Sequence, residues 1–239
     1  MVELDDELDI ELRDPDDIGS RIVLLTALAI WPDHETLEDR DTWVEWLGKQ
    51  GIFPQATRPE LVVLNDHRER ELVESDLDVC GRAFDSLQAL CWSAGLVDEI
   101  RLILDDDGSS DLMDRIPIPN EKVEPFLDEL IVRDENDIAL ERERAELWNW
   151  RLAAEVSRRR SGGSLRRELD EAIREVVLES AAAMVVPEND GADFLIGGAT
   201  VRSLDDDTIN TLLVASEEHL RALNWVCGLT EWGEIHLPD

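Results

Sequence analysis

Tyrosine is absent from this chain of 239 residues, and only Lys49 and Lys122 are lysines among its 23 basic residues. Cysteine is scarce too, with Cys80, Cys91 and Cys227. On one helix Cys80 and Cys91 would share a face but lie about 16 Å apart, which is too far for a disulfide. We therefore expect three reduced core thiols and a cytoplasmic location.

Long apolar runs are also missing. No run approaches the roughly 20 residues that a helix needs to span a bilayer, so we expect no contact with a membrane. The first 20 residues are acidic and do not resemble a secretory signal, which again favours the cytoplasm.

The motifs of the common enzyme classes are absent as well. The four histidines are His34, His67, His219 and His236. None of them has another His or Cys at metal-binding spacing, and the chain has no zinc, P-loop, dinucleotide or serine-hydrolase motif. Asp105-x-Asp107-Gly108 resembles part of a calcium loop, but the first ligand position falls on Ile103, which cannot bind the ion. We expect no metal, no cofactor and no catalytic constellation.

What the chain has in excess is negative charge. Asp and Glu number 57 against 23 Lys and Arg, for a formal charge of −34. Two interpretations are open: a solvated acidic coat from a halophilic or high-GC source, or an acidic protein that occupies a basic partner's site. The carboxylates are spread along the whole chain, which favours the coat. In either case such a protein repels nucleic acid and anionic membrane, so we expect it to bind neither.

Periodicity, capping residues and glycine stops predict a mainly α fold. The expected helices span residues 15–30, 36–50, 77–94, 120–132, 134–160, 164–186 and 205–227. Short apolar segments on either side of Gly197-Gly198 predict a small β-hairpin before the last helix. With no repeat and no long linker, we predict a single multi-helix domain over residues 14–239. Residues 1–13 would form an acidic tail or an edge strand.

Aromatic and polar side chains on the expected helices form one candidate cluster. It comprises Trp92, Trp148, Trp150, Arg221, Asn224 and Trp225. The last three lie at i, i+3 and i+4, and therefore on one helical face, where a buried Arg or Asn requires partners. One interpretation is a structural core that holds the last helix against the helices of Trp92 and Trp148. The other is a ligand pocket with Arg221 and Asn224 as its polar contacts.

Arginines form the one basic patch in this acidic chain. They are Arg158, Arg159, Arg160, Arg166 and Arg167, on both sides of a Ser-Gly-Gly-Ser break. The first three would complement the C-terminal dipole of their helix and pair with surface acids. The functional alternative is an anion or partner site beside the amides that begin the next helix.

Three segments carry a family resemblance. They are Phe84–Leu96, Glu146–Arg151, and Arg221–Trp225 followed by Trp232. In order and spacing they resemble a bacterial family known as domain of unknown function 4272. The resemblance implies a fold and a domain extent over roughly residues 15–236, and no mechanism, because the family has no assigned activity. Leu87-Gln88 and His219 depart from the family's pattern.

Two functions are compatible with these features. The first is a non-catalytic binding or protein-interaction protein, which the lack of a catalytic constellation favours. The alternative is a small-molecule-binding protein or an enzyme with a pocket lined by Trp, Arg and Asn side chains. A protein partner, a homodimer and a small molecule all remain open as partners.

Overall fold

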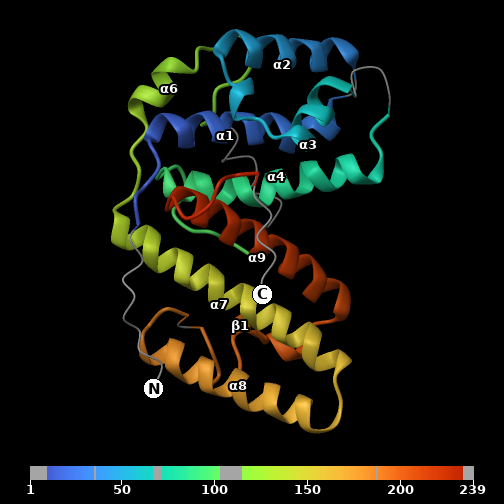
Figure 1. Cartoon of the computed structure of the whole chain (residues 1–239), viewed down its shortest axis with the longest axis vertical. Helices are drawn as coiled ribbons and strands as arrows, with labels where there is room; N and C mark the ends of the chain where they lie inside the picture. Colours follow the sequence, from blue (N-terminus) through green and yellow to red (C-terminus); the bar gives the residue numbers. More distant parts are fainter. Residues whose placement is uncertain (1–9, 35, 67–70, 103–114, 187, 234–239) are drawn as a thin grey trace. The chain divides into compact units, whose positions relative to one another are not determined.

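The computed structural model describes residues 10–34, 36–66, 71–102, 115–186 and 188–233. Helices make up most of it, and a two-stranded antiparallel hairpin comes just before the last helix (Figure 1). The predicted mainly α fold with a small hairpin is therefore confirmed. Part of the predicted N-terminal tail and the calcium-like segment Asp105–Gly108 lie outside the described residues.

Local capping explains where the first helices begin and end. Helix α1 (Pro15–Ala29) follows Asp14, whose carboxylate accepts the backbone N–H of Asp16 at 3.1 Å. Helix α2 (Leu37–Gln50) follows Thr36, whose hydroxyl oxygen accepts the N–H of Asp39 at 3.1 Å. It ends at Gly51, which has a left-handed φ of 76°. Both helices match their predicted bounds to within one residue.

By its internal contacts the chain divides into two compact units, one of Met1–Ala139 with Arg221–Asp239, and one of Leu140–Leu220. The first unit contains α1, α2, the 3-10 turns η1 (Trp31–Asp33) and η2 (Phe53–Gln55), α3 (Arg58–Leu61), the π-helical turn η3 (Val62–Asp66), α4 (Glu74–Ser93) and α6 (Glu124–Glu129). It also contains the start of α7 (Glu135–Arg160) and the end of α9 (Asp206–Val226).

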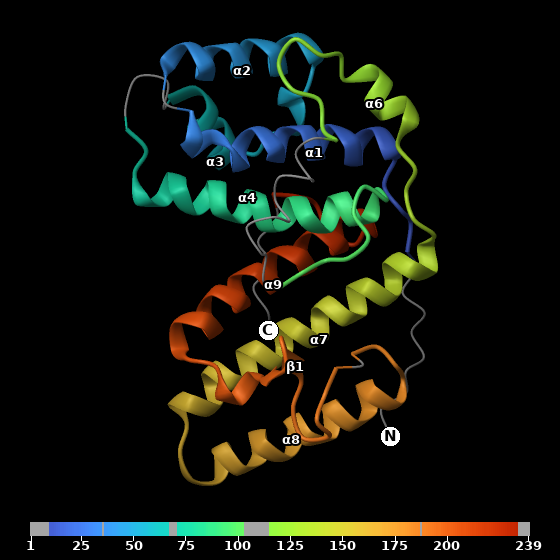
Figure 2. The ribbon, with the colours of Figure 1, turned by 180° about the vertical axis from the view of Figure 1, so that it is seen from behind.

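Helix α1 is the centre of the first unit. It lies between α2 and α4 (Figures 1 and 2), and every residue from Arg21 to Leu28 is buried. A helix that is apolar on all sides belongs in a core. Gly19 permits a close approach of α6, because a Cβ at this position would lie 2.4 Å from Cδ2 of Leu127.

The second unit is built around the larger part of α7. It contains α8 (Gly163–Ala182), the strands β1 (Leu195–Ile196) and β2 (Ala199–Thr200), the turn η4 (Val201–Ser203) and the first part of α9. Gly197 and Gly198 join the strands with φ values of 57° and 80°, which suit a hairpin turn with two left-handed residues. Phe194 is fully buried and contacts Trp148 edge to face, at 5.2 Å between ring centroids.

Three predicted segments differ in the structure, each for a local reason. The helix expected over residues 120–132 is only α6, because Asn120 has a φ of 79° and cannot lead into a right-handed helix. Helix α4 begins before residue 77, because the Asp76 carboxylate accepts the N–H of Val73 at 2.8 Å. Helix α8 stops before residue 186, where Met184 turns left-handed with a φ of 59°.

Candidate functional site

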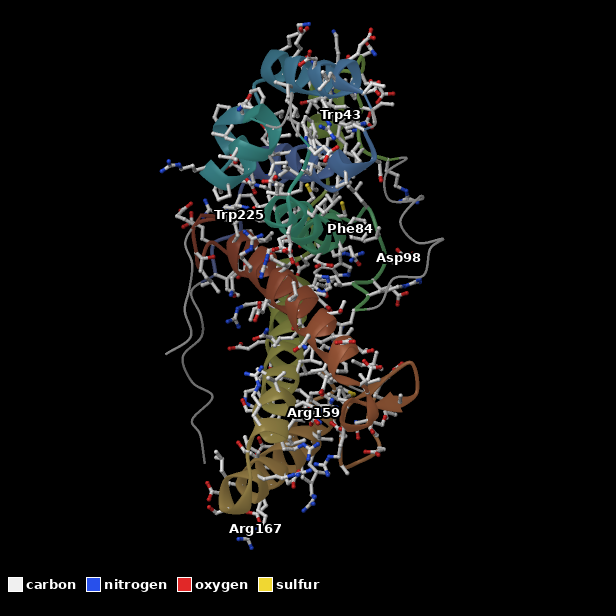
Figure 3. The ribbon with its side chains drawn as sticks, turned by 90° about the vertical axis from the view of Figure 1, so that its right-hand side faces the viewer. Trp43, Phe84, Asp98, Arg159, Arg167 and Trp225 are labelled. Carbon is white, nitrogen blue, oxygen red and sulfur yellow. The ribbon has the colours of Figure 1, made fainter. Side chains whose placement is uncertain are left out.

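The C-terminal residues singled out from the sequence lie together in the first unit. Trp225 is buried, and its carbonyl oxygen accepts the Nε–H of Arg13 at 3.0 Å (its place is labelled in Figure 3). The Arg221 guanidinium donates to Ser86 Oγ at 3.0 Å and to the carbonyl oxygen of Trp232 at 3.4 Å. Asn224 is half-buried, and its backbone carbonyl oxygen accepts the N–H of Leu229 at 3.0 Å.

Trp232, which the sequence analysis used only as a family feature, is the centre of this region. Its indole is 5% exposed and stands at 90° to the ring of Trp225, with 5.2 Å between centroids. The Cζ atoms of Arg21 and Arg221 each lie 4.5 Å from its centroid, and its Nε1–H donates to Glu60 Oε1 at 3.2 Å. We call Arg21, Glu60 and Arg221, with the space that the indole fills, the Trp232 socket.

Arg21 is the most deeply buried member of the socket. Its Nη1 lies 2.9 Å from Glu60 Oε2, and its Nη2 donates to the carbonyl oxygen of Gln55. Burial lowers the pKa of Arg21, the charge of Glu60 acts against this, and the nearby charge of Arg221 adds to it. The pair is therefore a desolvated ion pair, and the hydrogen bonds from the two Nη groups of Arg21 offset part of the cost of its burial.

The other three aromatic residues of the predicted cluster have separate surroundings. Trp92 is buried on α4, with the Arg133 Cζ 4.8 Å from its ring centroid. Trp148 and Trp150 belong to the second unit, where Trp148 contacts Phe194 and Trp150 is half-buried. The six predicted residues are thus distributed over both units.

The predicted arginine patch separates into two groups. Arg160, Arg166 and Arg167 are exposed, and the side chain of Arg167 points away from the ribbon in Figure 3. Arg158 and Arg159 instead turn toward Glu155 on their own helix, at 2.6 Å and 2.8 Å between the nearest atoms. These two arginines belong to a network that was not predicted from the sequence.

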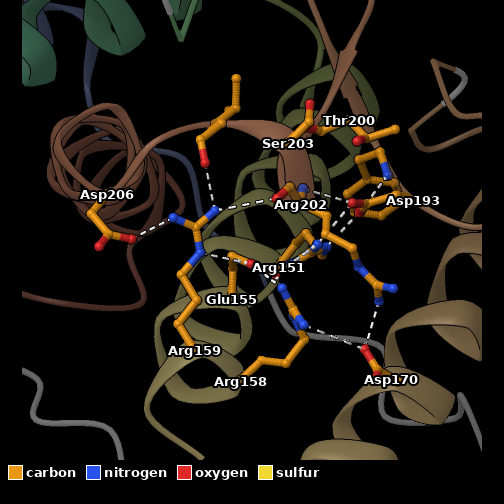
Figure 4. A network of polar contacts seen from close by, with 12 residues as sticks. Arg151, Glu155, Arg158, Arg159, Asp170, Asp193, Thr200, Arg202, Ser203 and Asp206 are labelled. Carbon is orange, nitrogen blue, oxygen red and sulfur yellow. Dashed lines mark hydrogen bonds and ion pairs between the residues drawn. The ribbon is translucent and has the colours of Figure 1, made fainter.

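That network is a set of ion pairs in the second unit, buried at its centre and exposed at Arg202 and Asp206 (Figure 4). Its members are Arg151, Glu155, Arg158, Arg159, Asp170, Asp193, Arg202 and Asp206. Its centre is dry, because the side chains of Arg151 and Glu155 are both 0% exposed. Four guanidinium groups face four carboxylates, so the charges balance.

Glu155 is the common acceptor of the network. Arg151 and Arg158 each donate to it twice, and Arg159 donates once. Burial by itself raises the pKa of Glu155, but the hydrogen bonds from Arg158 and Arg159 and the charge of Arg151 outweigh burial and lower this pKa to about 2. The same hydrogen bonds raise the pKa of Arg158 and of Arg159.

Asp193 connects the network to the hairpin region. Its carboxylate accepts Nε and Nη2 of Arg151 at 2.6 Å and 2.9 Å, and the backbone N–H groups of Phe194 and Arg202 at 2.9 Å each. The i, i+4 spacing of Arg151, Glu155 and Arg159 was a signal for the helical part of the network. No local pattern indicated Asp193.

A surface cavity lies beside α2 in the first unit. Its volume is about 660 Å³, and its lining includes the carboxylates of Glu38, Asp41, Glu45 and Glu121. Both lysines of the chain, Lys49 and Lys122, also line it. Trp46 lines it as well and donates its Nε1–H to the carbonyl oxygen of Glu121 at 2.8 Å.

Neither a metal-binding cluster nor a membrane-spanning helix occurs in the described part of the chain. No group of three or more His, Cys, Asp or Glu side chains there is arranged to hold a metal ion. None of the helices described in the structure is both long and apolar enough to cross a membrane. Cys80, Cys91 and Cys227 are buried free thiols.

Comparison with known protein families shows which family the chain belongs to. Residues 1–179 match the family described as Domain of unknown function (DUF4272). The chain belongs to this family. The match confirms the resemblance seen in the sequence; it includes Trp92 and the network arginines of α7, and it ends before the C-terminal motif of Arg221–Trp225. No curated protein and no solved structure matches the chain.

Proposed function

We propose that this member of the DUF4272 family is a cytoplasmic, non-catalytic binding protein. We propose further that it binds a partner segment rich in Lys and Arg at the cavity beside α2. The observation that carries the proposal is the lining of this cavity, where four carboxylates outnumber two lysines. A lining of this kind favours a ligand with several positive charges over an anionic or apolar one.

The spacing on α2 supports the same kind of partner. Glu38, Asp41 and Glu45 lie at i, i+3 and i+7 on α2, so the cavity meets carboxylates on successive helical turns. Lys49 Nζ is only 3.4 Å from Glu45 Oε2, and both side chains are largely exposed, so this pair can open at little cost.

Internal pairing of the buried charges supports a non-catalytic role. Arg151, Glu155 and Asp193 satisfy one another, and none of them depends on a ligand to complete its hydrogen bonds. This pairing favours groups used for folding over groups kept for reaction.

A charge-matched pair of variants tests the proposal. The first is Glu38→Gln/Asp41→Asn/Glu45→Gln on α2. The control is Glu168→Gln/Glu171→Gln/Glu175→Gln on α8, which has the same i, i+3, i+7 spacing and exposed side chains. Each variant changes the net charge by three, from −34 to −31.

The measurement is the fluorescence anisotropy of a labelled oligoarginine peptide at physiological salt. Exposed ion pairs contribute about 0.2–1 kcal/mol each, so the α2 variant should weaken binding roughly tenfold. The α8 control should weaken it less than about twofold, because it removes only long-range attraction. Equal weakening by the two variants would mean that total charge, and not this cavity, attracts the peptide.

A further inference from the structure

The Trp232 socket holds an aromatic ring in the way that a binding site holds a ligand. Guanidinium groups of Arg21 and Arg221 lie over the ring, and the Glu60 carboxylate receives its edge N–H. Arg21 and Glu60 are 3% and 6% exposed and Arg221 is half-buried, so two of the three groups that contact the ring are withdrawn from water. Cation–π contacts and charge-assisted hydrogen bonds both gain strength when they are desolvated.

One polar atom of the socket is left without a partner by the indole. Among the described residues, the Nε–H of Arg21 meets no acceptor, although the other two guanidinium nitrogens donate to Glu60 and Gln55. A buried donor without an acceptor destabilises the protein, so such atoms are rare. An indole has an N–H donor and no ring acceptor, and so Trp232 can satisfy Glu60 but not this atom.

We propose that the Trp232 socket is a binding site for a planar nitrogen heterocycle of the oxopurine class, and that Trp232 is its intramolecular occupant. Such a heterocycle presents a flat ring to the two guanidinium groups and an N–H donor to Glu60. It also carries ring nitrogen and carbonyl acceptors, which an indole lacks, for the Nε–H of Arg21. The site is separate from the cavity beside α2, so the two proposals stand or fall independently.

Arg13 also holds the segment that carries Trp232. Arg13 donates to the carbonyl oxygen of Thr230 at 2.9 Å and pairs with Glu231 at 3.0 Å, and the Glu231 side chain is 69% exposed. A free ligand must compete with the Trp232 side chain for the socket. Because that side chain is held on the same molecule, only molecules with an empty socket can bind the ligand. The apparent affinity of the wild type is therefore its intrinsic affinity multiplied by the fraction of molecules whose socket is empty.

Calorimetric titration of hypoxanthine, indole and benzofuran into the Trp232→Ala variant tests this assignment. Hypoxanthine has N–H donors and ring acceptors, indole has only the donor, and benzofuran has no N–H. We expect Trp232→Ala to bind hypoxanthine at least tenfold more tightly than the wild type does. Glu60→Gln in the same background should weaken that binding at least tenfold, the factor that a hydrogen bond to a charged group provides.

The matched control is Trp148→Ala, which removes an indole that contacts Phe194 in the second unit. It should not bind hypoxanthine. If Trp232→Ala binds benzofuran as tightly as hypoxanthine, the space is an unspecific apolar cavity and the proposal is wrong. The same conclusion follows if Glu60→Gln has no effect on hypoxanthine binding.

A wild-type measurement decides the question if Trp232→Ala does not fold. The protein labelled with 5-fluorotryptophan has eight indole resonances to follow by ¹⁹F NMR, and Trp232→Phe identifies the one of interest. Saturating hypoxanthine should shift the Trp232 resonance and leave the signals of Trp148 and Trp150 in place. An unchanged Trp232 resonance would refute the proposal.

Discussion

Replacing Glu155 by Gln removes the charge at the centre of the second unit's network while keeping the size of the side chain. The change leaves Arg151, which is fully buried, and Arg158, which is nearly so, without their shared carboxylate. Breaking a buried ion pair from one side typically costs about 3–5 kcal/mol of unfolding free energy. We therefore expect the variant to be less stable than the wild type by about 3 kcal/mol at pH 7.

The lowered pKa gives a second and independent magnitude. A carboxyl whose pKa falls from 4.5 to about 2 on folding stabilises the native state by roughly 3 kcal/mol when it is ionised in both states. Because the folded pKa is the lower one, this stability is complete above the unfolded pKa and is lost as the pH falls through the folded pKa. At pH 3 about 1.4 kcal/mol should remain.

Urea denaturation of the two proteins between pH 7 and pH 3 is the assay. Other carboxylates titrate in both proteins and cancel in the difference, so the stability gap should narrow by about half over this range. Glu175→Gln, an exposed carboxylate on α8, is the control and should stay within about 0.5 kcal/mol of the wild type. A gap that is absent at pH 7, or that stays constant down to pH 3, would refute the reasoning.

Three further results are expected. The melting temperature should rise between 0.1 M and 1 M KCl, because a charge of −34 repels itself and the Debye length falls from about 10 Å to about 3 Å; a flat or falling curve would contradict this. Trp225→Ala should lower the free energy of unfolding, measured in urea melts, by about 3–5 kcal/mol. Arg221→Ala should also destabilise the protein, because the hydrogen bonds from Arg221 to Ser86 and to the Trp232 carbonyl are lost. If both variants were as stable as the wild type, the cluster would have no structural role. Burial lowers the pKa of His219 to about 4 against a smaller opposing effect of Glu218, so the free energy of unfolding should decrease as the pH falls from 6.5 toward 4. His219→Gln should make the dependence of this free energy on pH less steep in that range. An unchanged dependence would show that His219 does not titrate there.

Local chemistry in the sequence was sufficient for the helices and the hairpin turn. Asp14, Thr36 and Gly51 act on backbone groups within a few residues, so their effects can be predicted without knowing the fold. The same local reasoning was wrong for Asn120, because an Asn at a helix start and an Asn in a left-handed turn look alike in sequence. Arg158 and Arg159 were predicted to belong to a basic patch. Their common acceptor, Glu155, was not predicted.

Tertiary structure decided which residues form the candidate sites. Trp232 and Glu60 are 172 residues apart, and Arg151 and Asp193 are 42 residues apart, so no periodicity links them. The sequence alone determined that the chain is acidic, mainly helical and rich in Trp. It could not determine which carboxylate pairs with which guanidinium. In a chain with 57 acidic residues, every arginine has many possible acceptors. Only folding selects one of them, since a buried charge is tolerated only where its partner is brought into hydrogen-bonding distance.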